Sequence, residues 1–183
     1  MQVAFDDYAW SAGVVTDLVN SSPLVWRGVD RMPDVTALRA FLDEHGLAAS
    51  RPVGDADLAP VHALRTRLRP LVEEADTERR VAEAGALTAA LGGVTLAGGG
   101  WVGTVPDDVP VADLLGVVAG VGLLAVQLHL GAERFRPCSS DTCEGVFIDT
   151  SRPGRRRYCM PGLCGNRANV AAHRARRRAA GTR

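Results

Sequence analysis

Apolar residues recur at helical spacing over much of the chain. Between residues 57 and 75 they fall at steps of three and four residues, which is typical of an amphipathic helix, and Pro70 is expected to kink it. Residues 35–44 repeat the pattern behind Asp34, a preferred N-cap residue, and Gly46 follows the last turn. The same reasoning predicts helices over residues 8–19 and 78–91.

The longest apolar run, residues 114–126, is shorter than the ~20 residues that a membrane-spanning helix needs. It lies in a predicted helix over residues 111–129, which we expect to be buried. Gly116, Gly120 and Gly122 would let neighbouring helices approach it closely. The first ten residues, MQVAFDDYAW, do not resemble a secretory signal, because no basic segment precedes an apolar core. We therefore expect a cytoplasmic protein with no membrane partner.

The periodicity changes in the middle of the chain. Residues 93–97 and 101–105 carry strand-forming residues on either side of the glycines at 98–100, which predicts a short β-hairpin. The glycines also match the dinucleotide-binding pattern GxGxxG, but that site needs a helix directly after them. The loop Val-Pro-Asp-Asp-Val-Pro follows instead, so the glycines are interpreted as turn residues.

Composition and charge add a second, basic region to this picture. With 183 residues, 46% of them hydrophobic, the chain can bury one ordinary core and a small second module. Residues 1–149 contain 11 arginines and all 21 acidic residues, a net charge of −10, whereas residues 150–183 contain 10 arginines and no acid. Such a basic block is typical of segments that bind polyanions, although a solvated tail has the same composition. By contrast, Arg65, Arg67 and Arg69 on a predicted helix are interpreted as solvated charge.

The four cysteines form two CxxxxC pairs, Cys138 with Cys143 and Cys159 with Cys164, separated by fifteen residues. Four thiolates at such spacing can complete the tetrahedral shell of Zn²⁺. Between the pairs, residues 145–149 and 155–158 flank a Thr-Ser-Arg-Pro-Gly turn, which predicts a hairpin too small and charged to fold without metal. Because four cysteines leave no coordination position open, the zinc is expected to be structural and not catalytic.

Three other interpretations of the cysteines stay open from the residues alone. Two disulfides would suit a secreted protein, but cytoplasmic thiols stay reduced. Free buried cysteines are not expected to cluster in matching pairs. An iron–sulfur cluster also takes four cysteines, and the spacing does not exclude it.

The order CxxxxC, Val-Phe-Ile-Asp, Arg-Arg-Arg-Tyr and CxxxxC, running directly into Gly-Asn-Arg, resembles the CGNR zinc-finger family over residues 134–178. Family members commonly carry Trp where this chain has Tyr158. In that family the finger follows a mostly helical ABATE domain, and Asp-Leu-Val-Asn at residues 17–20 and LRAFLDEHGL at residues 38–47 are similar to its opening. The resemblance implies a stress-induced transcription regulator whose finger binds DNA.

The residues and the resemblance together predict a mainly α fold in two domains. Residues 1–131 would form a helical, ABATE-like domain with a small β-hairpin, which senses a small-molecule effector or forms a homodimer. Residues 132–183 would form a treble-clef-like zinc finger, built from a β-hairpin and a basic helix around one Zn²⁺. We expect no enzyme, but a regulator that binds double-stranded DNA. The alternatives are an RNA-binding zinc protein and a small-molecule enzyme with a protein-interaction tail.

The expected nucleic-acid contacts lie in two arginine clusters. A helix from about Asn166 would gather arginines on one face, with alanines on the adjoining face, over roughly 16 Å. The planar donors of arginine suit phosphate and the guanine edge. The predicted contact residues are Arg155, Arg156, Arg157, Arg167, Arg174, Arg177 and Arg178.

Some single residues keep two interpretations. Arg167 contacts either phosphate or Asp149, and Asn166 either caps the helix or reads an adenine edge. In the loop after the first predicted helix, three residues are candidates for lining an effector pocket: Asn20, Trp26 and Arg27.

Overall fold

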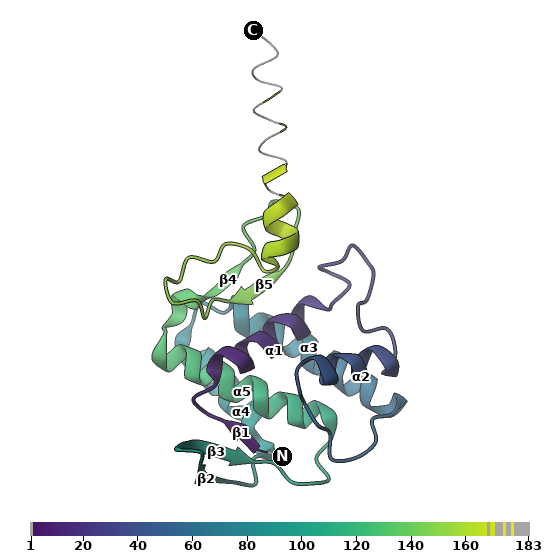
Figure 1. The fold of residues 1–183 in the computed structure, drawn as a ribbon, viewed down its shortest axis with the longest axis vertical. Coiled ribbons are helices and arrows are strands. Elements are labelled where there is room, and N and C mark those ends of the chain that lie inside the picture. Colours follow the sequence, from purple (N-terminus) through teal and green to yellow (C-terminus); the bar gives the residue numbers. More distant parts are fainter. Residues whose placement is uncertain (1, 168, 171–173, 175–176, 178–183) are drawn as a thin grey trace.

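The computed structural model describes residues 2–167, 169, 170, 174 and 177. A bundle of helices forms the body, with a three-stranded sheet at one end and a two-stranded sheet beside the cysteines at the other (Figure 1). The fold is therefore mainly helical, as the hydrophobic pattern predicts. The helices of the bundle are α1 (Tyr8–Asn20), α2 (Val35–Glu44), α3 (Leu58–Glu73), α4 (Thr77–Leu87) and α5 (Val111–His129).

Helix α5 is the centre of the body and packs against α1, α3 and α4. A Cβ on Gly120 would lie 2.6 Å from the Ala84 carbonyl oxygen of α4, and one on Gly122 would lie 2.6 Å from the Cβ of Ser11 on α1. Both glycines thus permit the predicted close approach, whereas Gly116 makes ordinary contacts. By length and composition α5 could cross a membrane, but 72% of its most apolar window is buried inside the protein. Here it serves as the core helix.

The helix ends follow the local sequence closely. α2 and α5 have the predicted bounds, and Asp34 accepts a hydrogen bond from the Ala37 N–H at 2.9 Å as the N-cap of α2. Helix α3 runs through Pro70. Helix α4 ends at Leu87 and continues as a 3₁₀ turn, Thr88–Ala90, so the helix predicted to residue 91 is shorter than expected.

Arg65 contradicts its interpretation as solvated charge. Its side chain on α3 is buried and donates hydrogen bonds of 2.8 Å to both carboxylate oxygens of Asp30, and one of 3.2 Å to Ser21 Oγ. Asp30 lies in the long connection between α1 and α2. The ion pair fixes this connection against α3, a contact over 35 residues that helical periodicity cannot predict.

The three-stranded sheet contains the predicted hairpin. β2 (Gly93–Ala97) and β3 (Gly100–Thr104) are antiparallel, and β1 (Gln2–Ala4), which the sequence pattern does not predict, joins the other side of β3. Gly98 and Gly99 have φ values of 61° and 88°, as a type I′ turn requires. The glycines are therefore turn residues, as interpreted.

The second sheet corrects the predicted zinc-finger hairpin. β5 (Val146–Ile148) pairs with β4 (Phe135–Pro137), with Phe135 opposite Ile148, and residues 155–158 form no strand. The reason is burial, because Phe135, Val146 and Ile148 all enter the hydrophobic core of the body. The arginine-rich segment 155–158 offers no apolar face that could replace β4.

Candidate metal centre

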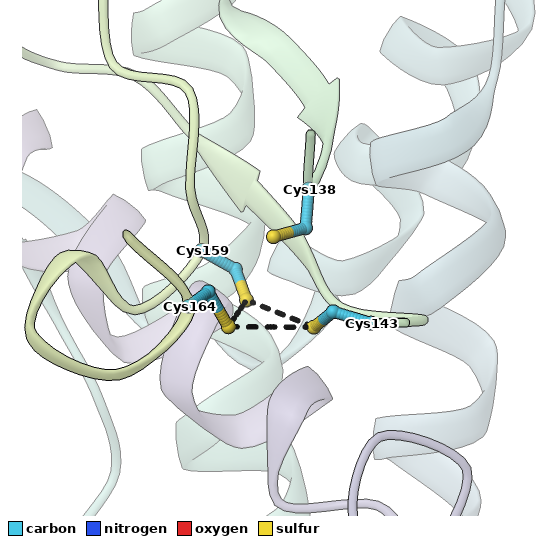
Figure 2. Close-up of side chains that lie close together, drawn as sticks. All are labelled: Cys138, Cys143, Cys159 and Cys164. Carbon is cyan, nitrogen blue, oxygen red and sulfur yellow. Dashed lines mark hydrogen bonds between the residues drawn. The ribbon is translucent and has the colours of Figure 1, made fainter. Parts of the chain in front are cut away.

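The four cysteines come together from two segments of the chain, one on each side of β5. Cys138 and Cys143 lie in the loop that joins β4 to β5, while Cys159 precedes and Cys164 lies within a helical turn, Pro161–Gly165. Figure 2 shows the four sulfur atoms turned toward a common point. All four Sγ atoms lie within 4.8 Å of one another. The Sγ of Cys143 lies 3.6 Å from those of both Cys159 and Cys164, which are 3.8 Å apart.

These separations fit a single tetrahedral zinc ion. Zn–S bonds of about 2.3 Å in a regular tetrahedron place the sulfur atoms about 3.8 Å apart. The cysteines are free thiols and not disulfides, and sulfur atoms this close leave no room between them for a cluster of several iron and sulfide ions. Four cysteine ligands also fill the coordination shell, so the site suits structure and not catalysis.

The backbone around the cysteines is shaped for this cluster. A Cβ on Gly145 would lie 2.5 Å from the Sγ of Cys159 and 3.1 Å from that of Cys143. The Gly145 N–H also donates to Cys143 Sγ at 3.3 Å, and the Gly145 carbonyl accepts from the Cys138 N–H at 2.8 Å. No residue larger than glycine fits at this position without displacing a ligand.

The protein alone does not favour four thiolates. Burial, aided by the neighbouring thiols, raises the pKa of the Cys159 thiol far above its usual range and that of Cys164 to about 11. For Cys138, burial acts in the same direction, but hydrogen bonds from the backbone of Cys159 and Ser140 outweigh it and lower the pKa. A divalent cation is needed to offset the cost of ionising the buried thiols, because it stabilises the thiolates that bind it.

Helix α1 fastens the cysteine-bearing hairpin to the body. The Asn20 side chain, 4% exposed, donates to the Val146 carbonyl at 2.7 Å and accepts from the Val146 N–H at 3.0 Å. One turn earlier, Thr16 Oγ1 accepts from the Ile148 N–H at 3.2 Å. These side chains satisfy the outer edge of β5 as a neighbouring strand would. The polar Thr16 and Asn20, four residues apart on the apolar α1, are the sequence signal for this contact.

The three residues predicted to line an effector pocket have different surroundings. The Trp26 indole N–H donates to the Asn20 carbonyl at 2.7 Å, and Arg31 lies over its ring at 4.9 Å. Asn20 and Trp26 border a hollow of about 300 Å³ that Met160 also lines. Trp26 and Arg27 border a second hollow of about 140 Å³, beside Cys164 and Arg167. A ligand in either hollow remains a prediction.

Asp149 is fully buried and pairs with residues other than Arg167. It accepts hydrogen bonds from the Ser151 N–H and hydroxyl at 3.0 and 2.6 Å and from the Arg156 N–H at 2.9 Å, and Arg136 lies 3.4 Å away. Burial alone would raise the pKa of Asp149, but these hydrogen bonds and the charge of Arg136 hold it below its usual range. Arg167 is exposed at the surface instead.

The other predicted residues of the basic end divide into exposed and engaged side chains. Arg156 is engaged: its Nε donates to the Tyr158 carbonyl at 2.9 Å, and its guanidinium lies 4.8 Å from the centre of the Phe147 ring. Arg178 lies outside the described residues, and so do the alanines of the predicted alanine face. The predicted contact residues that are exposed are Arg155, Arg157, Arg167, Arg174 and Arg177.

The expected N-cap role of Asn166 is wrong. Its backbone is already helical, with φ −64° and ψ −43°, whereas an N-cap residue lies outside the helical region. Its side chain donates backward to the Gly162 carbonyl at 2.7 Å. Asn166 thus ties the start of the basic helix to the turn that carries Cys164.

Comparisons with known proteins agree with this geometry. Residues 134–177 match the CGNR zinc finger, and residues 13–131, more than half of the chain, match the ABATE family, described as "Putative stress-induced transcription regulator". A search of curated proteins finds no match. The finger match and the converging sulfur atoms together show that the four cysteines hold one structural zinc ion. This chain therefore belongs to the ABATE family and carries a zinc-binding CGNR finger after its helical body.

Proposed function

We propose that this protein is a cytoplasmic transcription regulator that binds double-stranded DNA through the arginines of its finger. The observation that carries the proposal is the exposure of Arg155, Arg157, Arg167, Arg174 and Arg177 on a segment that contains no acidic residue. Arg156 is left out, because its side chain already donates to the Tyr158 carbonyl and lies over the Phe147 ring. Exposed guanidinium groups on an acid-free surface attract the phosphate backbone before any base is read.

The spacing of the helical arginines supports contact with one phosphate backbone. Arg167 and Arg174 are seven residues apart and lie about 20° apart around a helix, while Arg177 lies at their flank. Ten residues of regular helix, the separation of Arg167 and Arg177, rise about 15 Å, which is long enough to follow several phosphates. Arg27 from the body lines the same small hollow as Arg167, so the body contributes a cation next to the finger.

Duplex DNA is favoured over single-stranded RNA by the placement of the aromatic residues. Phe147 is fully buried, and Arg157 lies 5.7 Å from the ring centre of the half-buried Tyr158. Proteins that bind single strands usually offer free aromatic faces on which bases stack. Neither aromatic side chain offers such a face here.

An effector would act where the body meets the finger. The hollow of about 300 Å³ is lined by Asp17, Trp26 and Glu44 from the body and by Met160, which follows the zinc ligand Cys159. A small molecule held there would contact both parts of the protein, and it would shift the finger's ligand loop if it bound one position of that loop more tightly than another. In a variant with Trp10 and Trp101 replaced by Phe, quenching or a spectral shift of the Trp26 fluorescence by a metabolite reports occupancy of this hollow.

The test is fluorescence anisotropy of a labelled duplex with the zinc-loaded full chain, over about 50–200 mM salt. We expect affinity to fall with a log–log slope near −0.9 for each phosphate contact, and Arg174→Ala to reduce the slope by about one contact. Arg79→Ala, whose side chain on α4 is 72% exposed, is the matched control and leaves the slope unchanged. The proposal fails if duplex DNA does not bind at low salt, or if RNA displaces it at equal concentration.

A further inference from the structure

The outer edge of the three-stranded sheet is unprotected. β2 is the edge strand, and in the part of the chain that the structure describes no strand pairs with its outer side. Its residues, Gly93–Ala97, include no charged residue and no proline, which are the usual devices that keep an edge from pairing. β1, at the opposite edge, is only three residues long. An edge like β2 is a template for another strand.

The register of the hairpin determines which backbone groups face outward. The two-residue turn makes Ala97 and Gly100 a hydrogen-bonded pair, so Thr95 is the next residue that bonds to β3. Alternation then directs the N–H and C=O groups of Val94 and Leu96 away from β3, toward the free edge. These outward groups are placed symmetrically about Thr95.

The side chains next to this edge are apolar and exposed. Val94, Leu96 and Trp101 lie on one face of the hairpin and are 54%, 65% and 57% exposed. Beside them on α5, Leu128 is 78% exposed, and a hollow of about 380 Å³ separates the hairpin from this helix. Clustered exposed apolar side chains of this size mark an interaction surface.

We propose that β2 pairs antiparallel with β2 of a second copy of this chain, joining the two sheets across a two-fold axis at Thr95. In this register Val94 of one copy lies opposite Leu96 of the other, and the two residues exchange both main-chain hydrogen bonds. The apolar side chains of both copies then form one continuous face. The strand is complementary to itself, which favours a second copy over an unrelated extended peptide.

The dimer goes beyond the proposed function and does not depend on it. The three-stranded sheet lies at the end of the body opposite β4 and β5 (Figure 1), whose connecting loop carries Cys138 and Cys143, so pairing through β2 leaves the zinc site and the exposed Arg167 uncovered. Each dimer then presents two fingers. Failure to bind DNA would leave the dimer intact, and failure to dimerise would leave a monomeric DNA-binding protein, so the two proposals fail separately.

The first test is the mass in solution of the zinc-loaded full chain, measured by light scattering after size exclusion. We expect twice the chain mass of 19.3 kDa. Leu96→Lys places a charge beside the partner's Val94 without touching the core, and is expected to weaken the dimer at least tenfold. Leu24→Lys, at a site 53% exposed between α1 and α2, is the matched control and remains dimeric. A wild-type protein that stays monomeric up to about 100 µM, or a dimer unaffected by Leu96→Lys, overturns the proposal.

The second test fixes the register. Two copies of Thr95 face each other at the axis as a non-hydrogen-bonded pair with Cα atoms about 4.5 Å apart, which is within disulfide range. Thr95→Cys is therefore expected to form an intermolecular disulfide under mild oxidation, while Leu96→Cys, which faces Val94, does not. Zinc content is measured in parallel to show that the native thiols stay metal-bound. Equal cross-linking of both variants, or of neither, overturns this pairing.

Discussion

The helical body and the zinc finger are stabilised by different physics. The body buries a continuous set of apolar side chains, among them Leu18, Leu68 and Leu115, each fully removed from water. In the described part of the finger, the separate buried cluster consists of Phe147, Cys159 and Cys164. A core of that size does not offset the conformational entropy of the chain around it. The difference teaches that hydrophobic burial folds the body, whereas metal binding folds the finger.

The boundary between these two regimes runs through the β4–β5 hairpin. Phe135, Val146 and Ile148 belong to the core of the body, although they flank the first pair of zinc ligands. The intervening Phe147 faces the finger, because neighbouring residues of a strand point to opposite faces. One strand thus serves both cores. The predicted division into domains at residue 131 stays a prediction, and residues 135–148 are the place to test it.

The largest expected effect separates the two regimes. Cys164→Ser removes one thiolate from the site, and the finger is expected to lose its zinc and its order while the body keeps its helices, since zinc binding is worth about 10–16 kcal/mol to small zinc modules. Metal analysis should fall from one zinc per chain toward none. Hydrogen exchange should rise over residues 150–167 and stay slow in α5.

Thr142→Ser is the matched control for this prediction, because Thr142 is exposed and lies directly before Cys143. It should bind one zinc and exchange like the wild type. If Cys164→Ser retains a full zinc load, or if the body unfolds together with the finger, the contrast between the two regimes is wrong.

A smaller effect is expected where the regimes meet. Asn20→Ala leaves the buried N–H and C=O of Val146 without partners, which costs about 1–3 kcal/mol for each group. Because Asn20 joins the body to the hairpin, we expect both a lower unfolding free energy and faster zinc release to a chelator. Thermal unfolding and chelator kinetics measure the two effects.

Asn20→Asp sharpens the same comparison. The aspartate can still accept from the Val146 N–H, but it cannot donate to the Val146 carbonyl. The aspartate variant should therefore keep the hydrogen bond from the Val146 N–H that the alanine variant loses. It also places a carboxylate oxygen against the Val146 carbonyl oxygen, which is unfavourable. Unchanged zinc release in both variants would show that the body and the finger are energetically independent.

The smallest expected effect is a difference between the body and the finger in how their stability depends on pH. The hydrogen bonds from Arg65 are the main cause that holds the pKa of Asp30 below its usual 3.8. Because the folded pKa lies below the unfolded one, the pair gives its full stability above about pH 4 and loses it as pH falls through the folded pKa. Asp30→Asn should lower the unfolding free energy by about 1–3 kcal/mol near neutral pH. This gap between the unfolding free energies of the wild type and the variant should close in acid.

Denaturant unfolding of the helices at several pH values measures this gap, with Asp43→Asn on the exposed side of α2 as the control. The finger should respond at higher pH than the body, because protonation of its thiolates releases zinc. A gap for Asp30→Asn that is constant down to about pH 3 would rule out this origin of its stability.

Much of this architecture follows from neighbouring residues along the chain. The apolar periods and the caps predict the bounds of α2 and α5, and the paired glycines predict the β2–β3 turn. The spacing of the cysteines predicts the zinc site, and the four sulfur atoms do converge. These predictions are correct because each depends on a few adjacent residues or on metal-ligand chemistry that accepts few residue types and spacings.

Other features depend on which distant segments meet, and these the tertiary structure alone decides. The sequence does not indicate that β5 pairs with β4 and not with residues 155–158, or that Arg65 turns inward to Asp30. The polar Asn20 on the apolar α1 does signal a buried polar contact, but the sequence does not identify its partner, Val146, which is 126 residues away. A strand takes the partner that lets its apolar face reach the core, and a buried polar group takes whatever partner the packed chain brings to it. Local pattern therefore determined the helices and the metal ligands, whereas burial decided how the finger is attached to the body.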